Sequence, residues 1–286
     1  MTPRDITEEL KARIAPDSPM ESLGRYIEKI LHEKFGLSKA QAADLQESKT
    51  KQSIKLIERE ISRASLLGIP PPFQLSDNKK HIGGSCRISL NDSPETVKLK
   101  QGRKEKSAAL KEIKELSPKA FELFCSKTLK ELGCTHSEVT QLSSDQGVDF
   151  IGQFNLGKFQ GLPNGFYKLI HDIELFIVGQ AKHYPSTRLG PTIIREVLGS
   201  VQLAKHELFY SSNSPLENFN IKPYSPVMTM IFTTGEFTKN AESLAEKTGT
   251  IIKNGQQLAT FLTERGIGID ENSNFSKDLF QKWLDS

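Results

Sequence analysis

Ser144-Asp145-Gln146-Gly147-Val148-Asp149-Phe150 is the first of two short stretches that indicate the fold of this 286-residue chain. The second stretch is Gly179-Gln180-Ala181-Lys182. The first stretch is a glycine-containing turn that leads into a strand near Asp149. The second closes an almost continuous apolar run at residues 173–180, which is typical of a central strand buried on both faces. Side chains two apart on a strand point the same way, so Gln180 and Lys182 share a face. We expect both to meet Asp149 from the neighbouring strand.

Helices and strands alternate around these two stretches. Strands are expected at residues 137–142, 148–154, 173–180, 226–233 and 250–253, and helices at 117–132, from 191 onwards, at 238–247 and at 256–264. Residues 156–172 contain Pro163-Asn164-Gly165 and indicate a hairpin-like insertion. The alternation predicts an α/β fold, with a mixed, open central sheet flanked by helices on both sides.

The first third of the chain has a helical pattern. Ser18-Pro19-Met20-Glu21 has the form of a capping box and predicts a helix that ends before Gly36. A second helix is predicted at 49–67, and a connector with one strand at 86–90 is predicted for residues 70–106. We therefore expect a mainly helical N-terminal region at 1–72, a connector at 73–110 that can belong to the same domain, and a second domain at 111–286.

Composition excludes some classes of protein. No apolar run approaches the roughly 20 residues of a membrane span, and the N-terminus has no apolar segment of a secretory signal. A cytoplasmic protein without a membrane partner is therefore expected. Cys86, Cys125 and Cys134 lack the two-residue spacing of zinc and redox sites, so we expect buried, reduced thiols.

Charge permits a polyanionic partner without requiring one. The formal net charge is +3, from 38 Lys and Arg against 35 Asp and Glu. Residues 98–119 carry eight Lys or Arg against three Glu. This segment either contacts a phosphate backbone or is an ordinary solvated helix face.

Asp149, Gln180 and Lys182 carry the candidate chemistry. A carboxylate, an amide oxygen and the Ala181 carbonyl are hard oxygen ligands that suit Mg²⁺. A nearby ammonium positions a water and eases its deprotonation, so the set suits hydrolysis of a phosphodiester. These residue types at strand ends are also common without such a role, and the wider order of motifs has to decide.

Several further motifs follow one another along the chain. They are Phe121-Glu122, Glu196-Val197-Leu198-Gly199, Phe232-Thr233-Thr234-Gly235-Glu236-Phe237-Thr238 and Gly255-Gln256-Gln257-Leu258-Ala259. With the two stretches above, the sequence from 116 to 269 resembles the Mrr family of restriction endonuclease-like nucleases, a branch of the PD-(D/E)xK superfamily. The fold that this resemblance implies is the restriction endonuclease-like α/β fold.

The resemblance implies a role for each site residue. Asp149 matches the metal-binding aspartate, Gln180 stands where relatives carry Glu or Asp, and Lys182 matches the catalytic lysine. Glu122 resembles the helix glutamate that supplements the metal site, although it is also explained as a carboxylate favoured by the helix dipole. The implied metal ligands are Asp149, Gln180 and Ala181.

The sequence departs from the family pattern at three positions. Val148 replaces a proline, Gln146 replaces a glycine, and His183 replaces a more frequent arginine. None of these changes removes an implied ligand or the lysine. Asp145 is interpreted as a residue that stabilises the turn.

The implied function is a Mg²⁺-dependent DNA endonuclease, with Mn²⁺ as a substitute, that acts in restriction or anti-phage defence. Double-stranded DNA is the expected partner, and cutting both strands suggests a homodimer. His183, Arg188 and Arg195 are expected to contact backbone phosphates, or else to be solvated surface. Two alternatives stay open: a repair or recombination nuclease that recognises DNA structure, and a non-catalytic DNA-binding module. The N-terminal region would select the target or oligomerise, or would be a packing extension.

Overall fold

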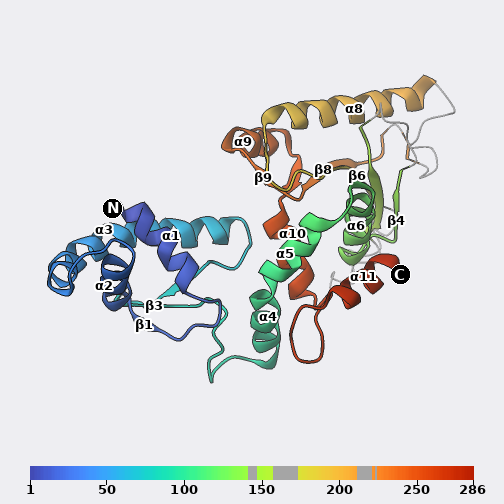
Figure 1. Cartoon of the computed structure of the whole chain (residues 1–286). Helices are drawn as coiled ribbons and strands as arrows, with labels where there is room; N and C mark the ends of the chain where they lie inside the picture. Colours follow the sequence, from blue (N-terminus) through green and yellow to red (C-terminus); the bar gives the residue numbers. More distant parts are fainter. Residues whose placement is uncertain (141–146, 157–172, 211–220, 223) are drawn as a thin grey trace, which may run out of the picture. The chain divides into compact units, whose positions relative to one another are not determined.

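The computed structural model describes residues 1–140, 147–156, 173–210, 221–222 and 224–286 (Figure 1). The chain forms two compact units, each described by itself. Unit 1 is Met1–Ala109 with Ala259–Leu279, and unit 2 is Leu110–Leu258 with Phe280–Ser286. No helix in the described ranges is both long and apolar enough to cross a membrane. The predicted insertion at 157–172 and the turn residue Asp145 lie outside the described residues.

Unit 1 is mainly helical. Its elements are α1 (Pro3–Arg13), β1 (Glu21–Ser22), α2 (Leu23–Glu33), α3 (Lys39–Leu66), β2 (Gln74–Leu75), β3 (His81–Gly83) and α4 (Pro94–Lys104). The helix α5 (Lys106–Glu115) begins in unit 1 and ends in unit 2. Apolar residues from α1, α2, α3 and β3 form one core, which contains Ile6, Leu10, Ile27, Ile57 and Ile82.

The predicted boundaries in unit 1 need three corrections. Glu21 pairs with Ile82 in a small sheet of order β1-β3-β2, so α2 begins only after Ser22, whose hydroxyl accepts the Arg25 N–H. Tertiary strand pairing thus overrides the local capping signal at Ser18. The second helix starts ten residues earlier than predicted, at Lys39, because Ser38 forms the capping box there. The strand predicted at 86–90 is wrong, since the described strands of this region are β2 and β3.

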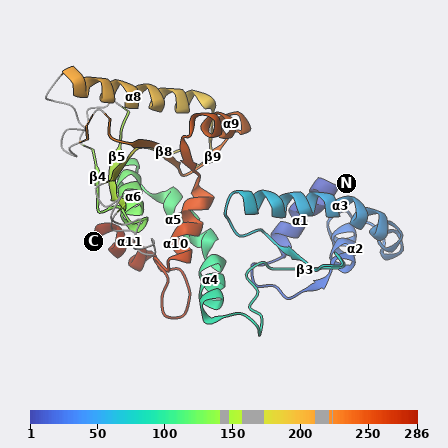
Figure 2. The same ribbon diagram turned by 180° about the vertical axis from the view of Figure 1, so that it is seen from behind.

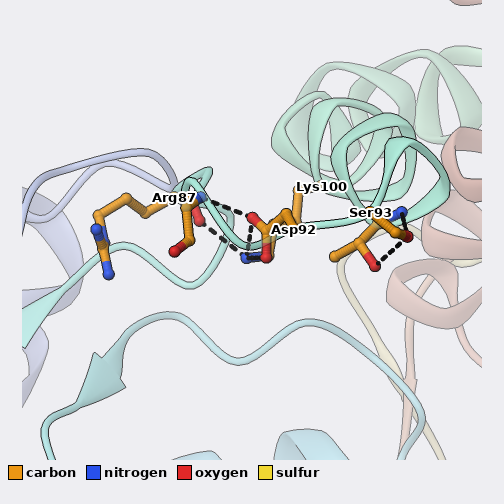
Figure 3. A network of polar contacts seen from close by, with 6 residues as sticks. Arg87, Asp92, Ser93 and Lys100 are labelled. Atoms are coloured by element: carbon orange, nitrogen blue, oxygen red, sulfur yellow. Dashed lines mark hydrogen bonds and ion pairs between the residues drawn. The ribbon is translucent and has the colours of Figure 1, made fainter.

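Polar contacts hold the segment that joins β3 to α4 (Figure 3). The Lys100 ammonium donates to the Arg87 carbonyl at 3.0 Å and forms an ion pair with Asp92 at 2.8 Å. Asp92 in turn accepts the Ser89 N–H at 2.7 Å, and Ser93 caps α4. The predicted connector therefore contains β2 and β3, a loop held by these polar contacts, and the helix α4.

Unit 2 contains the predicted mixed sheet. Its elements are α6 (Pro118–Glu131), β4 (His136–Val139), β5 (Phe150–Asn155), β6 (Glu174–Lys182), β7 (Arg188–Leu189), α8 (Pro191–Tyr210), β8 (Val227–Thr233), β9 (Glu236–Phe237), α9 (Lys239–Thr248) and β10 (Ile251–Lys253). The helices α10 (Gly255–Glu264) and α11 (Lys277–Asp285) each contribute to both units. The five-stranded sheet has the order β10-β8-β6-β5-β4. The strands β10, β8 and β6 are parallel, while β5 and β4 are antiparallel to their neighbours.

Helices cover both faces of this sheet, which confirms the predicted fold class (Figures 1 and 2). A side chain at Gly152 of β5 would meet Leu129 of α6. The neighbouring Ile151 belongs instead to a core that includes Ile194 and Val197 of α8. Because successive strand residues face opposite sides, α6 and α8 lie on opposite faces.

Phe150 and Gly179 fix the centre of the sheet on the α6 side. Phe150 stacks on Phe232 of β8, with ring centroids 5.3 Å apart. Gly179 of β6, which lies between these two strands, leaves space for the Phe150 ring, and a Cβ there would overlap ring carbons. The apolar run of β6 therefore needs its glycine at this position.

Replacing Gly179 with alanine is expected to destabilise the protein by about 1–3 kcal/mol, because the added methyl forces the Phe150 ring out of its stack. Urea unfolding followed by circular dichroism measures the change. Gly199→Ala is the control, since a Cβ at this position of α8 meets no atom within 4 Å. That variant should be neutral or more stable by less than about 1 kcal/mol. Equal stabilities for the two variants would contradict the packing argument.

Candidate active site

Asp149 lies at a bulge where β5 begins. Phe150 pairs with Gly179, and the Asp149 N–H also donates to the Gly179 carbonyl, at 2.9 Å. Asp149 and Phe150 thus both stand opposite Gly179, which is the arrangement of a β-bulge. A bulge changes the direction in which the side chain of Asp149 points. Thr140 holds the other edge, because its N–H donates to the Asp149 carbonyl at 3.0 Å and its hydroxyl donates to the Val148 carbonyl.

The Asp149 carboxylate meets β6 directly. Its Oδ2 accepts the backbone N–H of Ala181 at 2.8 Å. The N–H and C=O of one strand residue point to the same edge, so the Ala181 carbonyl also faces the start of β5. The structure therefore brings together two of the three predicted ligand residues, the carboxylate of Asp149 and the backbone of Ala181.

Gln180 is buried, with 7% of its surface exposed, and its Oε1 has no hydrogen-bond partner. A Cβ added at Gly147 would lie 3.4 Å from Gln180 Nε2 and 2.7 Å from Ser200 Oγ. Gly147 also has a φ of +63°, which favours glycine. The turn before Asp149 can therefore lie against Gln180 and α8 only with glycine at this position.

Lys182 ends β6 with a fixed backbone. Its carbonyl accepts the Thr233 hydroxyl at 2.8 Å and the Thr234 N–H at 3.3 Å. Strand alternation places its side chain on the same face as Gln180. Its ammonium acts on Asp149 at a distance, where its charge lowers the pKa of that carboxyl.

Burial raises the pKa values of the acidic groups at the site. Burial raises the pKa of Asp149 above its ordinary value, and the Ala181 N–H and the Lys182 charge only partly offset this. Burial, followed by the charge of Asp149, raises the pKa of Glu122 on α6. Burial also raises the pKa of Cys125, one helical turn further on, well above its ordinary value, with Asp149 and Glu122 adding to the effect. Glu122 is therefore close enough to interact with Asp149, and the Cys125 thiol stays protonated.

The three predicted phosphate contacts have different surroundings. His183 Nε2 lies 3.2 Å from the Lys114 carbonyl, and its ring meets Phe121 edge-on. Arg188 forms an ion pair with Glu236 at 3.0 Å, although 69% of its side chain is exposed. Arg195 is exposed on α8. His183 thus has a clear packing role, and the two arginines are accessible from solvent.

Sequence reasoning missed Thr140, Cys125 and Ser200 as residues of this site. Thr140 orients Asp149, Cys125 fills the space beside Glu122, and Ser200 abuts Gly147. The motif of residues 196–199 ends next to Ser200, and it was the available signal for that contact. The predicted reduced state of the thiols agrees with the structure, because all three cysteines are free and buried.

The donor set fits a hard divalent cation. The described residues contain no group of three or more His, Cys, Asp or Glu side chains that could hold a metal, so a cation site here depends on other oxygens. The unpartnered, buried Gln180 Oε1 is such an oxygen, and the Asp149 carboxylate and the Ala181 carbonyl are the others. A cation would also relieve the repulsion between Glu122 and Asp149.

The mixed sheet with helices on both faces, and the site at the ends of its strands, have the form of the restriction endonuclease-like α/β fold. Residues 113–215 match the Mrr catalytic-domain family, which is described as a restriction endonuclease. The match confirms, for these residues, the resemblance seen in the sequence.

Three solved structures are similar to the chain at low levels. The restriction endonuclease MspJI in complex with a 27-mer oligonucleotide has 19% identity and a TM-score of 0.40, covering 69% of this chain and 38% of that one. The restriction endonuclease FokI bound to DNA has 13% identity and a TM-score of 0.34, covering 92% and 44%. A second FokI structure has 13% identity to this chain and a TM-score of 0.33. The chain thus spans less than half the length of these enzymes, and no curated protein matches it.

Asp149→Asn is expected to raise the melting temperature by about 2–4 °C at neutral pH in EDTA, because it removes a buried charge and keeps the acceptor for the Ala181 N–H. A raised carboxyl pKa means that the native state binds protons more tightly. Wild-type stability is therefore lost as pH rises from the ordinary pKa of 3.8 through the raised value, and the difference should vanish below that window.

Thermal melts between pH 3.5 and pH 8 test this expectation. Glu246→Gln, on the exposed surface of α9, is the control and should leave the melting temperature unchanged. A melting temperature lower for Asp149→Asn than for the wild type at pH 8 in EDTA would contradict this expectation, because it would show that the charge of Asp149 stabilises the metal-free protein.

Proposed function

We propose that the chain is a divalent-metal-dependent endonuclease that hydrolyses phosphodiester bonds of double-stranded DNA, in restriction or anti-phage defence. Mg²⁺ is the proposed ion, with Mn²⁺ able to substitute. The observation that carries this proposal is the Asp149 carboxylate, which accepts the Ala181 N–H at 2.8 Å, next in sequence to Gln180 with its unpartnered, buried oxygen. The match of residues 113–215 to a restriction endonuclease family supports the same reading.

The chain's own residues divide the work. Asp149, Gln180 Oε1 and the Ala181 carbonyl would hold the cation, which when bound would supply Lewis-acid stabilisation of the phosphate and acidify a water. Lys182 orients that water and balances charge as it loses a proton. Glu122, whose pKa is raised by burial and by the Asp149 charge, would hold a second ion or a metal-bound water. Burial of Asp149 strengthens each of these electrostatic interactions.

The assignment extends to the domains and the assembly. The proposed nuclease domain is 111–286, preceded by the helical region 1–72 and the segment 73–110. Because one active site cuts one strand, we propose a homodimer for double-strand cleavage. Arg188 and Arg195 are proposed backbone-phosphate contacts, since both are exposed.

Wild-type protein is expected to cut plasmid DNA with Mg²⁺ and to be inactive in EDTA. Asp149→Ala and Lys182→Ala should each lower the rate by at least about 100-fold, because each removes a group that acts on the reacting phosphate. Agarose-gel assays on methylated and unmethylated plasmid measure both activity and substrate choice. Lys247→Ala, an exposed lysine of α9, is the matched control and should keep wild-type activity.

DNA binding in EDTA separates the enzyme from a binding module. Binding without cleavage of any duplex by the wild type, with either metal, would contradict the proposed hydrolysis. Cleavage that prefers branched or single-stranded DNA would replace restriction with repair as the role.

Gln180→Leu is expected to stabilise the protein in EDTA by about 1–3 kcal/mol. The same change is expected to abolish Mg²⁺-dependent cutting. The leucine removes a buried oxygen that has no partner, so stability rises, and it also removes a proposed ligand. Gln180→Glu should keep activity and reach half-maximal rate at a lower Mg²⁺ concentration. Thermal melts in EDTA and a Mg²⁺ titration of cleavage measure the two effects. If Gln180→Leu cuts like the wild type, Gln180 is not a ligand.

A further inference from the structure

A cavity of about 250 Å³ lies in unit 2, beyond the end of β6. Its walls combine segments that have no role in the proposed hydrolysis. They include Lys114 of α5, the stretch from Pro185 to Arg188, residues 234–236 and Gln256 of α10. Two motifs noted in the sequence, residues 232–238 and 255–259, therefore meet at this cavity.

Thr234 gives the cavity an unmet hydrogen-bonding group. The residue is 1% exposed, and its Oγ1 has no partner, although Thr234 lines the cavity. The preceding Thr233 differs, because its hydroxyl donates to the Lys182 carbonyl at 2.8 Å. An unpartnered buried hydroxyl lowers stability, and a ligand that accepts its hydrogen bond would recover that loss.

The charge of the walls favours an anion. Lys114 and Arg188 are cationic, and Glu236, the one acid among the lining residues, is paired with Arg188 at 3.0 Å. The helix α10 also begins here, with Gln256 in its first turn, and its N-terminal dipole is positive. The Gln257 N–H of this turn already donates to Asn254 Oδ1 at 3.0 Å, so the groups available to a phosphate are the Lys114 ammonium and the Thr234 hydroxyl, within the field of the helix dipole.

The cavity lies close to the proposed catalytic lysine. The Thr234 N–H donates to the Lys182 carbonyl at 3.3 Å, and Pro185 is three residues beyond Lys182. Three residues span at most about 10 Å. Phosphates of one DNA strand follow at about 3.4 Å along the helix axis. A strand whose scissile phosphate lies at Lys182 therefore has further phosphates within reach of the cavity.

We propose that this cavity is a second phosphate subsite, in which Lys114 and Thr234 hold a DNA backbone phosphate near the one that is cleaved. The inference rests on the proposed function, since it assumes that DNA is the substrate. It assigns the positioning of the strand to residues outside the metal site. Such a contact fixes register and affinity without reading the sequence of bases.

Fluorescence anisotropy of a labelled 20-base-pair duplex, with the full chain in EDTA, tests the subsite without cleavage. Lys114→Ala is expected to weaken binding about 3- to 10-fold and to lower the slope of log affinity against log salt by about 1. Thr234→Val should weaken binding by a similar factor while its melting temperature stays equal or rises, because valine removes the unpartnered hydroxyl. A purely structural threonine would not give this opposite pair of effects.

Lys111→Ala is the matched control, because Lys111 lies on the same helix and is exposed at 73%. Wild-type affinity and salt slope for both Lys114→Ala and Thr234→Val would overturn the proposal, as would no DNA binding by the wild type. If inorganic phosphate raises the melting temperature of the wild type alone while all variants bind DNA equally, the cavity takes a free anion and the DNA assignment is overturned. Weaker DNA binding by the two variants in a protein that never cuts would support the subsite and refute the proposed hydrolysis.

Discussion

The hydrogen bond from the Ala181 N–H to the Asp149 carboxylate is the interaction on which the arrangement of the site depends. It joins the first residue before β5 to the end of β6, so the bulge at Asp149 and the position of Lys182 are set together. The glycines follow from the same constraint. Gly147 itself can lie against Ser200 of α8, and Gly179 leaves space for the Phe150 ring on the opposite face. A larger side chain at either position would displace the backbone that carries Asp149.

Much of unit 2 could be predicted from the sequence because its signals are local and consistent. The continuous apolar run of β6 and the capping serine of α6 lead to boundaries within two residues of those observed. Unit 1 was harder, since Ser18 and Ser38 both have the form of a capping residue and only the pairing of Glu21 with Ile82 decides between them. The short strands β2 and β3 have no periodicity to detect.

The site could be predicted only in part, for a physical reason. Residue types and strand alternation indicate Asp149, Gln180 and Lys182 as a group, and the structure places the Asp149 carboxylate on the N–H of Ala181, between the other two. Thr140 and Ser200 could not be found in this way, because their contacts depend on the bulge and on the approach of α8. Similarly, the ion pair of Arg188 with Glu236 follows from the pairing of β7 with β9. Strands of two residues are too short to give a periodic pattern from which this pairing could be predicted.

Among the described residues of unit 2, the buried side-chain oxygens without a hydrogen-bond partner lie at the same end of the parallel strands. Lys182 and Thr233 are partners in the β6–β8 register, and Gln180 and Thr234 lie beside them. Each of the two unpartnered oxygens lowers stability by about 1–3 kcal/mol, which is a large share of the total of a typical domain. The carboxyl ends of parallel strands are where α/β sheets bind ligands, because backbone groups and loops converge there without further pairing. The two oxygens without partners at this edge are therefore the positions where the proposed ligands would act, a cation at Gln180 and a phosphate at Thr234.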